Sequence, residues 1–88
     1  MDQMDIIELN EAFAAQVLAC LHAWKVDPSD PRLNPNGGAI ALGHPLGMTG
    51  ARILYSAALE LALREKQFAL VTLCVGVGQG YACILERA

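Results

Sequence analysis

The chain has 88 residues, a net charge of −3 and no cluster of Lys or Arg, which argues against binding to nucleic acid or to an anionic membrane surface. Its first residues, MDQMD, lack the basic region of a signal peptide, and no apolar run approaches the ~20 residues of a transmembrane helix. Hydrophobic residues make up 55% of the chain and charged residues only 17%, against about 25% charged residues in a typical domain. We therefore expect a piece of a larger domain or of an obligate homo-oligomer.

The first part of the chain predicts a strand, a helix and a loop. Residues 5–9 (DIIEL) form a short apolar run that is typical of a buried strand. Residues 11–24 (EAFAAQVLACLHAW) are rich in Ala and Leu and predict a helix. Apolar residues surround this helix instead of forming one stripe, so we expect it to be buried on all sides. The prolines and small polar residues of 26–35 (VDPSDPRLNP) predict a surface loop.

The second part predicts a helix followed by two antiparallel strands. Residues 38–42 (GAIAL) predict a short strand, and residues 48–65 predict a helix whose apolar positions repeat every 3.6 residues, with Thr49 as a candidate N-cap. Residues 68–75 and 81–86 are apolar runs with β-branched side chains, joined by a GVGQG segment that is short enough for a hairpin. The order of these elements predicts a layered α/β fold with a mixed sheet and buried helices.

The cysteines restrict the cofactor and the compartment. Cys20, Cys74 and Cys83 are odd in number and show no CxxC spacing, which argues against a disulfide framework and a structural zinc site. No other group of His, Cys and carboxylate residues has metal-ligand spacing, so we expect no metal. Free thiols favour a reducing compartment, and we expect a cytoplasmic protein.

The glycines indicate where a site would lie. All eight fall between residues 37 and 80, where a missing side chain lets a ligand or another backbone segment approach the chain. Among them, His44 lies between Gly43 and Pro45, directly before a predicted helix. The positive end of a helix dipole disfavours imidazolium, and a neutral imidazole suits a general base or a hydrogen-bond donor to a carbonyl. A histidine that only fills the turn explains the motif equally well.

Residues 74–80 (CVGVGQG) place a thiol beside further glycines. A dinucleotide-binding fingerprint is excluded, because the residues that follow (YACILE) predict a strand where that fingerprint needs a helix. What remains is the thiol of Cys74 at a strand end, next to backbone N–H groups that can bind an oxyanion. A buried structural cysteine beside a tight turn is the simpler explanation of this motif taken alone.

Asn10 follows the first predicted strand and, by itself, is best explained as an N-cap. With His44 and Cys74 it forms a set of three side chains, each at the end of an element and each used in acyl chemistry. Their convergence on one edge of the sheet would suit acyl transfer through a thioester. Glu8 and Glu11 could be two working carboxylates, although charges at a strand end and a helix start are the simpler explanation.

Three segments together are highly specific: NEAF at 10–13, NGGAIALGHPLGMTGAR at 36–52 and CVGVGQG at 74–80. In order and spacing they resemble the three C-terminal signature blocks of the thiolase family, and the similarity extends over essentially the whole chain. The resemblance implies that residues 1–88 are a fragment of a thiolase C-terminal domain. It also implies an acyltransferase that cleaves a 3-ketoacyl-CoA with free CoA, or runs the Claisen condensation in reverse, with CoA as a substrate and no cofactor.

The resemblance further implies roles for four residues. His44 matches the histidine that activates the acylated nucleophile and helps to polarise the thioester oxygen. Asn10 matches the asparagine that orients a water in the first oxyanion hole. Cys74 matches the acid/base cysteine that exchanges a proton with the α-carbon of acetyl-CoA, and Gly76 matches the glycine whose N–H contributes to the second oxyanion hole.

One departure bears on activity. A thiolase is several times longer, has a duplicated fold and carries its nucleophilic cysteine in the N-terminal half, and Cys20 is in the wrong context to replace that residue. We therefore expect the isolated chain to be inactive and its partner to be the remainder of a thiolase, in a homo-oligomer. Val77 departs from the CxGGGxG pattern of biosynthetic acetoacetyl-CoA thiolases, and together with NPNGG it favours a degradative 3-ketoacyl-CoA or 3-oxoadipyl-CoA enzyme.

Two alternatives from other classes stay open. The chain could be a self-associating α/β module without catalysis, which the apolar helix at 11–24 favours and sedimentation would test. It could also bind acyl-CoA without chemistry, although only Lys25, Arg32 and Arg52 lie near enough to the motifs to pair with CoA phosphates. Titration with CoA would test that alternative, and we expect no binding.

Overall fold

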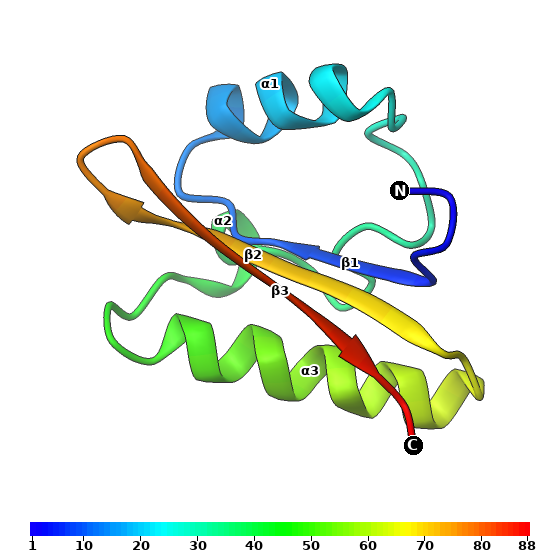
Figure 1. The fold of residues 1–88 in the computed structure, drawn as a ribbon. Helices are drawn as coiled ribbons and strands as arrows, with labels where there is room; N and C mark the ends of the chain where they lie inside the picture. Colours follow the sequence, from blue (N-terminus) through cyan, green and yellow to red (C-terminus); the bar gives the residue numbers. More distant parts are fainter.

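The computed structural model describes all 88 residues, which form a sheet covered by helices on both faces (Figure 1). Strand β1 (Ile6–Leu9) pairs in parallel with β2 (Phe68–Gly76), and β2 pairs antiparallel with β3 (Gln79–Glu86), so β2 is central. Helix α1 (Ala14–Trp24) lies on one face of the sheet and α3 (Thr49–Arg64) on the other. The predicted layered α/β fold with a mixed sheet is confirmed. None of the helices is both long and apolar enough to span a membrane.

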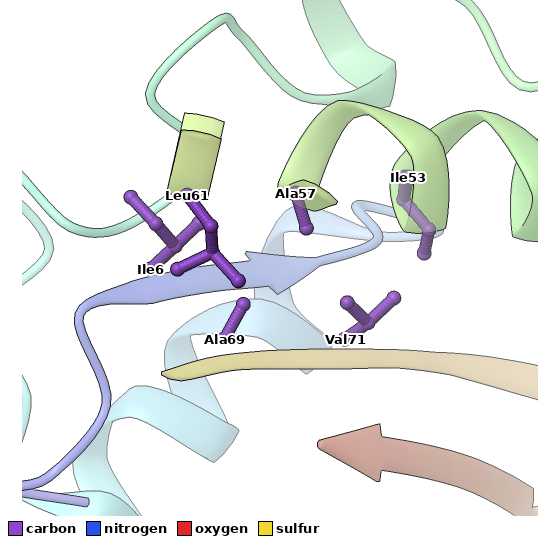
Figure 2. Close-up of a cluster of buried hydrophobic side chains, with 6 residues drawn as sticks. All are labelled: Ile6, Ile53, Ala57, Leu61, Ala69 and Val71. Carbon is purple, nitrogen blue, oxygen red and sulfur yellow. The ribbon is translucent and has the colours of Figure 1, made fainter. Parts of the chain in front are cut away.

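Two hydrophobic clusters hold the layers together, one on each face of the sheet. Successive side chains of a strand point to opposite faces, so Ile6 and Ile7 of β1 enter different clusters. Figure 2 shows the cluster under α3, which contains Ile6, Ile53, Ala57, Leu61, Ala69 and Val71. The cluster under α1 contains Ile7, Leu9, Val17, Leu21 and Val26. Because both faces of β1 are buried, its sequence is apolar with a single charged residue instead of alternating.

Helix α1 is buried along one side only. Val17 and Leu21, one turn apart, face the sheet, while Leu18 is 54% exposed on the other side. The helix begins at Ala14, later than the predicted Glu11, because Phe13 takes the extended N-cap conformation (φ −144°). The sequence predicts that α1 is buried on all sides, whereas in the structure the apolar outer side of this helix is exposed.

The prediction of a strand at residues 38–42 is wrong. These residues form one helical turn, α2 (Ala39–Leu42), in which the N–H groups of Leu42 and Gly43 donate to the carbonyls of Gly38 and Ala39 at 3.0 and 2.7 Å. The free edge of β1, where such a strand would pair, is occupied by an earlier part of the chain. The backbone groups of the segment are therefore satisfied within its own turn.

That earlier part is the predicted surface loop, which makes more contacts than expected. The loop backbone makes two hydrogen bonds with the backbone of Ile7. The N–H of Ile7 donates to the Arg32 carbonyl, and the N–H of Asn34 donates to the Ile7 carbonyl, each at 2.8 Å. The Asn34 side chain continues this pattern, accepting from the Leu9 N–H and donating to the Leu9 carbonyl at 2.9 Å each. A side-chain amide thus stands in for a neighbouring strand and fixes the end of β1.

The predicted helix at 48–65 and the predicted hairpin are confirmed with small changes. Met48, not Thr49, occupies the N-cap position of α3, and the Thr49 hydroxyl serves a different purpose described below. The hairpin turns at Val77 and Gly78, both with positive φ (52° and 72°). A β-branched residue is rarely found in that region of φ, so the turn is strained at Val77.

Candidate active site

The three motifs meet where β1 and β2 end. Cys74 and Gly76 belong to the last residues of β2, and His44 lies in the segment between α2 and α3. His44, Cys74 and Gly76 line one open hollow of about 690 Å³, together with Thr49 and Phe13. Asn10 does not line this hollow, but its side chain contacts His44, which does. The structure therefore brings all four predicted residues into one neighbourhood.

Asn10 is buried and its side chain contacts His44. It is 2% exposed, its N–H donates to the Thr72 carbonyl at 3.0 Å, and its Nδ2 lies 3.5 Å from Nε2 of His44. The N-cap explanation of Asn10 is wrong, because Phe13 is the N-cap of α1 and no side chain caps that helix. The Oδ1 of Asn10 is buried without a hydrogen-bond partner. Such an atom is a ready acceptor for a bound water or ligand group.

The contacts of His44 assign its tautomer. Its Nδ1 lies 2.6 Å from Oγ1 of Thr49, and the same oxygen lies 3.1 Å from the Pro45 carbonyl. A hydroxyl has one hydrogen and a carbonyl can only accept, so Thr49 donates to Pro45 and Nδ1–H of His44 donates to Thr49. The lone pair of His44 is then on Nε2, which faces Asn10. This arrangement suits a general base.

Cys74 and Gly76 supply a thiol and a backbone N–H to the same hollow. Cys74 is a free, half-buried thiol, and it also borders a second hollow on the α1 side that contains Cys20. Gly76 has φ 105°, and a Cβ built there would meet no atom within 4 Å. Glycine is therefore required at 76 by backbone conformation rather than by crowding within this chain. No group of three or more His, Cys, Asp or Glu side chains is arranged to hold a metal ion.

Sequence reasoning missed several residues that support the site. Thr49 was predicted as an N-cap, but its hydroxyl group contacts His44 and fixes the tautomer of that side chain. The position of Thr49 in the first turn of a helix, five residues after the histidine, is the sequence feature that could have indicated this contact. Glu11 accepts the Ile40 N–H, and Arg52 donates to the Gly43 carbonyl, on either side of α2. The first contact links two separate motifs and the second joins residues nine positions apart within one motif, and neither is revealed by the spacing of the residues.

Glu8 is an unusual buried acid beside this site. It lies on the same face of its strand as Asn10, is 4% exposed and borders a cavity of about 30 Å³ with Arg52. Burial raises the pKa of Glu8 from 4.5 to about 7; Arg52 opposes this shift, whereas Glu60 and Glu11 add to it. The carboxyl group is therefore half protonated near neutral pH.

We expect the folding stability of the chain to fall as the pH rises from about 4.5 to about 7. In this range the folded chain keeps a proton on Glu8 that the unfolded chain has released, so the free energy of unfolding decreases with pH. The full change corresponds to about 3 kcal/mol. Urea unfolding at a series of pH values would measure it, and Glu8→Gln should remove the slope. The exposed Asp2→Asn is the matched control, and an equal slope in wild type and Glu8→Gln would contradict the assignment.

Comparison with known proteins agrees with the geometry. The protein-family model described as the C-terminal domain of thiolase matches residues 1–87 of the chain. The chain is 58% identical over 87 residues to the beta-ketoadipyl-CoA thiolase of Acinetobacter baylyi and 61% identical over 84 residues to the 3-oxoadipyl-CoA/3-oxo-5,6-dehydrosuberyl-CoA thiolase of Escherichia coli. These alignments cover 99% and 96% of the chain but only 22% and 21% of the relatives, so the chain spans about a fifth of their length. The chain belongs to the thiolase family, and its residues 1–87 match the C-terminal domain of that family.

Proposed function

We propose that the chain supplies the acid/base and oxyanion residues of a thiolase that cleaves a 3-ketoacyl-CoA with CoA, or runs the reverse condensation. The observation that carries the proposal is the environment of His44. Its Nδ1–H is fixed by Thr49, its Nε2 lone pair lies next to Asn10, and it shares a hollow with Cys74. The names of the relatives make 3-oxoadipyl-CoA the favoured substrate within the 3-ketoacyl-CoA class.

In the proposed reaction His44 is the base that activates a nucleophilic cysteine supplied by the remainder of the thiolase. Its Nε2 takes the proton of the nucleophilic thiol, and the thiolate attacks the ketone carbon of the substrate. The protonated Nε2 then donates a hydrogen bond to the oxyanion that forms. A water donates one of its hydrogens to Oδ1 of Asn10, which has no partner within the chain, and donates the other to the same oxyanion.

Cys74 and Gly76 serve the other product. Cleavage of the Cα–Cβ bond leaves the electron pair on the α-carbon of acetyl-CoA as an enolate, and the Cys74 thiol protonates that carbon. The Gly76 N–H, at the end of β2, stabilises the enolate oxygen. The Cys74 thiolate then takes the proton of the CoA thiol, and the CoA thiolate attacks the acyl-enzyme. The nucleophile leaves with the electron pair of the broken thioester bond and recovers its proton from His44, which releases the shortened acyl-CoA and restores all three groups.

The nucleophile and the rest of the active site come from the remainder of a thiolase. Cys20 cannot replace the nucleophile, because it packs against the cluster under α1 and borders a different hollow from His44. The uncovered apolar side of α1 fits the proposal that residues 1–88 form part of one domain in a larger, oligomeric enzyme. Three free thiols fit a reducing cytoplasm.

Two preparations test the proposed function. The purified 88-residue chain is expected to show no CoA-dependent cleavage of acetoacetyl-CoA, because it lacks the acylated thiol. A chimera in which residues 1–88 replace the matching segment of the Escherichia coli relative is expected to cleave 3-oxoadipyl-CoA, a substrate in the name of that relative. Loss of the 3-ketoacyl-CoA enolate absorbance measures both. Turnover by the isolated chain would refute the division of residues, and a folded but inactive chimera would refute the catalytic assignment of the chain.

A further inference from the structure

The helical turn α2, which directly precedes His44, is held near both of its ends by side chains from outside the turn. At its start, Oε1 of Glu11 accepts the N–H of Ile40 at 3.1 Å. At its end, Nη2 of Arg52 donates to the carbonyl of Gly43 at 3.0 Å. The backbone hydrogen bonds of α2 are otherwise within its own turn, and no side chain caps it from within. A single turn has little stability of its own, so contacts from outside the turn, these two among them, hold it in place.

Gly38 shows how closely Glu11 approaches this segment. A Cβ built at Gly38 would overlap the carboxyl group of Glu11. The φ of Gly38 is −100°, a value open to any residue, so its backbone conformation does not require glycine. The side chain of Glu11 therefore fills the space that a residue with a Cβ would need, and positions 11 and 38 form a matched pair.

Glu11 also directly follows Asn10, which contacts Nε2 of His44. The same short segment thus hydrogen bonds the imidazole with one residue and anchors its loop with the next. We propose that Glu11 and Arg52 are positioning residues that hold His44 in the orientation in which Nδ1 meets Thr49 and Nε2 meets Asn10. Neither residue touches the reacting atoms. The catalytic consequence rests on the proposed function, whereas the orientation of His44 does not.

The orientation is tested in the 88-residue chain by the ¹⁵N signals of the His44 side chain, which report its tautomer. We expect a single Nδ1–H tautomer in the wild type and a mixture in Glu11→Ala. Glu11→Gln keeps an oxygen that can accept the Ile40 N–H, and it should restore the wild-type signals. A purely structural role would lower the unfolding free energy of Glu11→Ala but leave the tautomer of the folded molecules unchanged, which would overturn the proposal.

A double substitution tests the contact itself and covers the case in which Glu11→Ala folds poorly. Gly38→Ala alone is expected to disturb the His44 signals because the new methyl group displaces the Glu11 carboxyl group. In the Glu11→Ala background the same change should have no further effect, since the space is then free. Equal effects of Gly38→Ala in both backgrounds would contradict the matched pair.

Kinetics of the chimera measure the catalytic consequence. Glu11→Ala and Arg52→Met are each expected to lower kcat about 10-fold or more with little change in KM, the pattern of a misplaced catalytic group. Glu11→Gln should retain most of kcat. An unchanged kcat in both variants would overturn the positioning role. If the unsubstituted chimera is inactive while the tautomer depends on Glu11, the proposed function fails and the positioning of His44 stands.

Discussion

Replacing His44 by alanine in the chimera is expected to lower kcat for 3-oxoadipyl-CoA cleavage by at least ~10²-fold, the scale of general acid–base catalysis. The imidazole is held by Thr49 through Nδ1 and presents its lone pair at Nε2. His44 is the only histidine among the residues that line the hollow, and no carboxylate residue lines it. Steady-state turnover measures the loss, and the rate of acylation in a single turnover should fall with it.

The matched control for this experiment is His22→Ala. His22 is an exposed histidine on α1 and lies outside the hollow that contains His44. Turnover of the His22 variant should stay close to that of the unsubstituted chimera. Near-normal turnover of the His44 variant, with intact structure, would refute its assignment as the base.

Replacing Cys74 by alanine is expected to cost at least ~10²-fold in kcat for a different reason. The Cys74 thiol is the proposed donor and acceptor of the α-proton of acetyl-CoA, so its loss should remove exchange of the acetyl-CoA methyl protons with solvent deuterium. Acylation of the nucleophile by acetyl-CoA does not use that proton and should persist. Deuterium incorporation measured by mass spectrometry, beside an acylation assay, separates the two steps.

Cys83→Ala is the matched control for Cys74. Cys83 lies on β3 and packs against the cluster under α3, so its loss removes a thiol without touching the hollow of His44. Exchange should remain in this variant. If Cys74→Ala kept the exchange at the wild-type rate, another group would have to move the proton and the assignment of Cys74 would be wrong.

Most of the fold was predictable because its local and tertiary preferences agree. The strands at residues 6–9, 68–76 and 79–86 combine apolar runs with turn residues, and α3 has a clear helical period. The exception is α2, where a short Ala- and Ile-containing run fits a strand or a helical turn equally well. The outcome there is decided by long-range contacts, from Glu11 to Ile40 and from the loop at Leu33 to Ile7. No local pattern encodes them.

The site divides in the same way. His44, Cys74, Asn10 and Gly76 stand in motifs whose residue types suggest their chemistry, and the sequence alone singles them out. The tautomer of His44 could not be predicted, since it follows from two distances to one threonine oxygen. Nor could the pKa of Glu8, which depends on burial created by the packing of α3.

The outer edge of β3 has a practical consequence for any work with the isolated chain. β3 pairs with β2 on one side and has no strand on the other, and it exposes Tyr81 (62%) and Ile84 (61%). An open edge with apolar side chains offers a template on which further copies can add strand by strand. The 88-residue chain should therefore precipitate at high concentration more readily than the chimera if the remainder of the enzyme covers this edge. Dilute samples or a solubilising fusion partner would then be needed to keep it in solution.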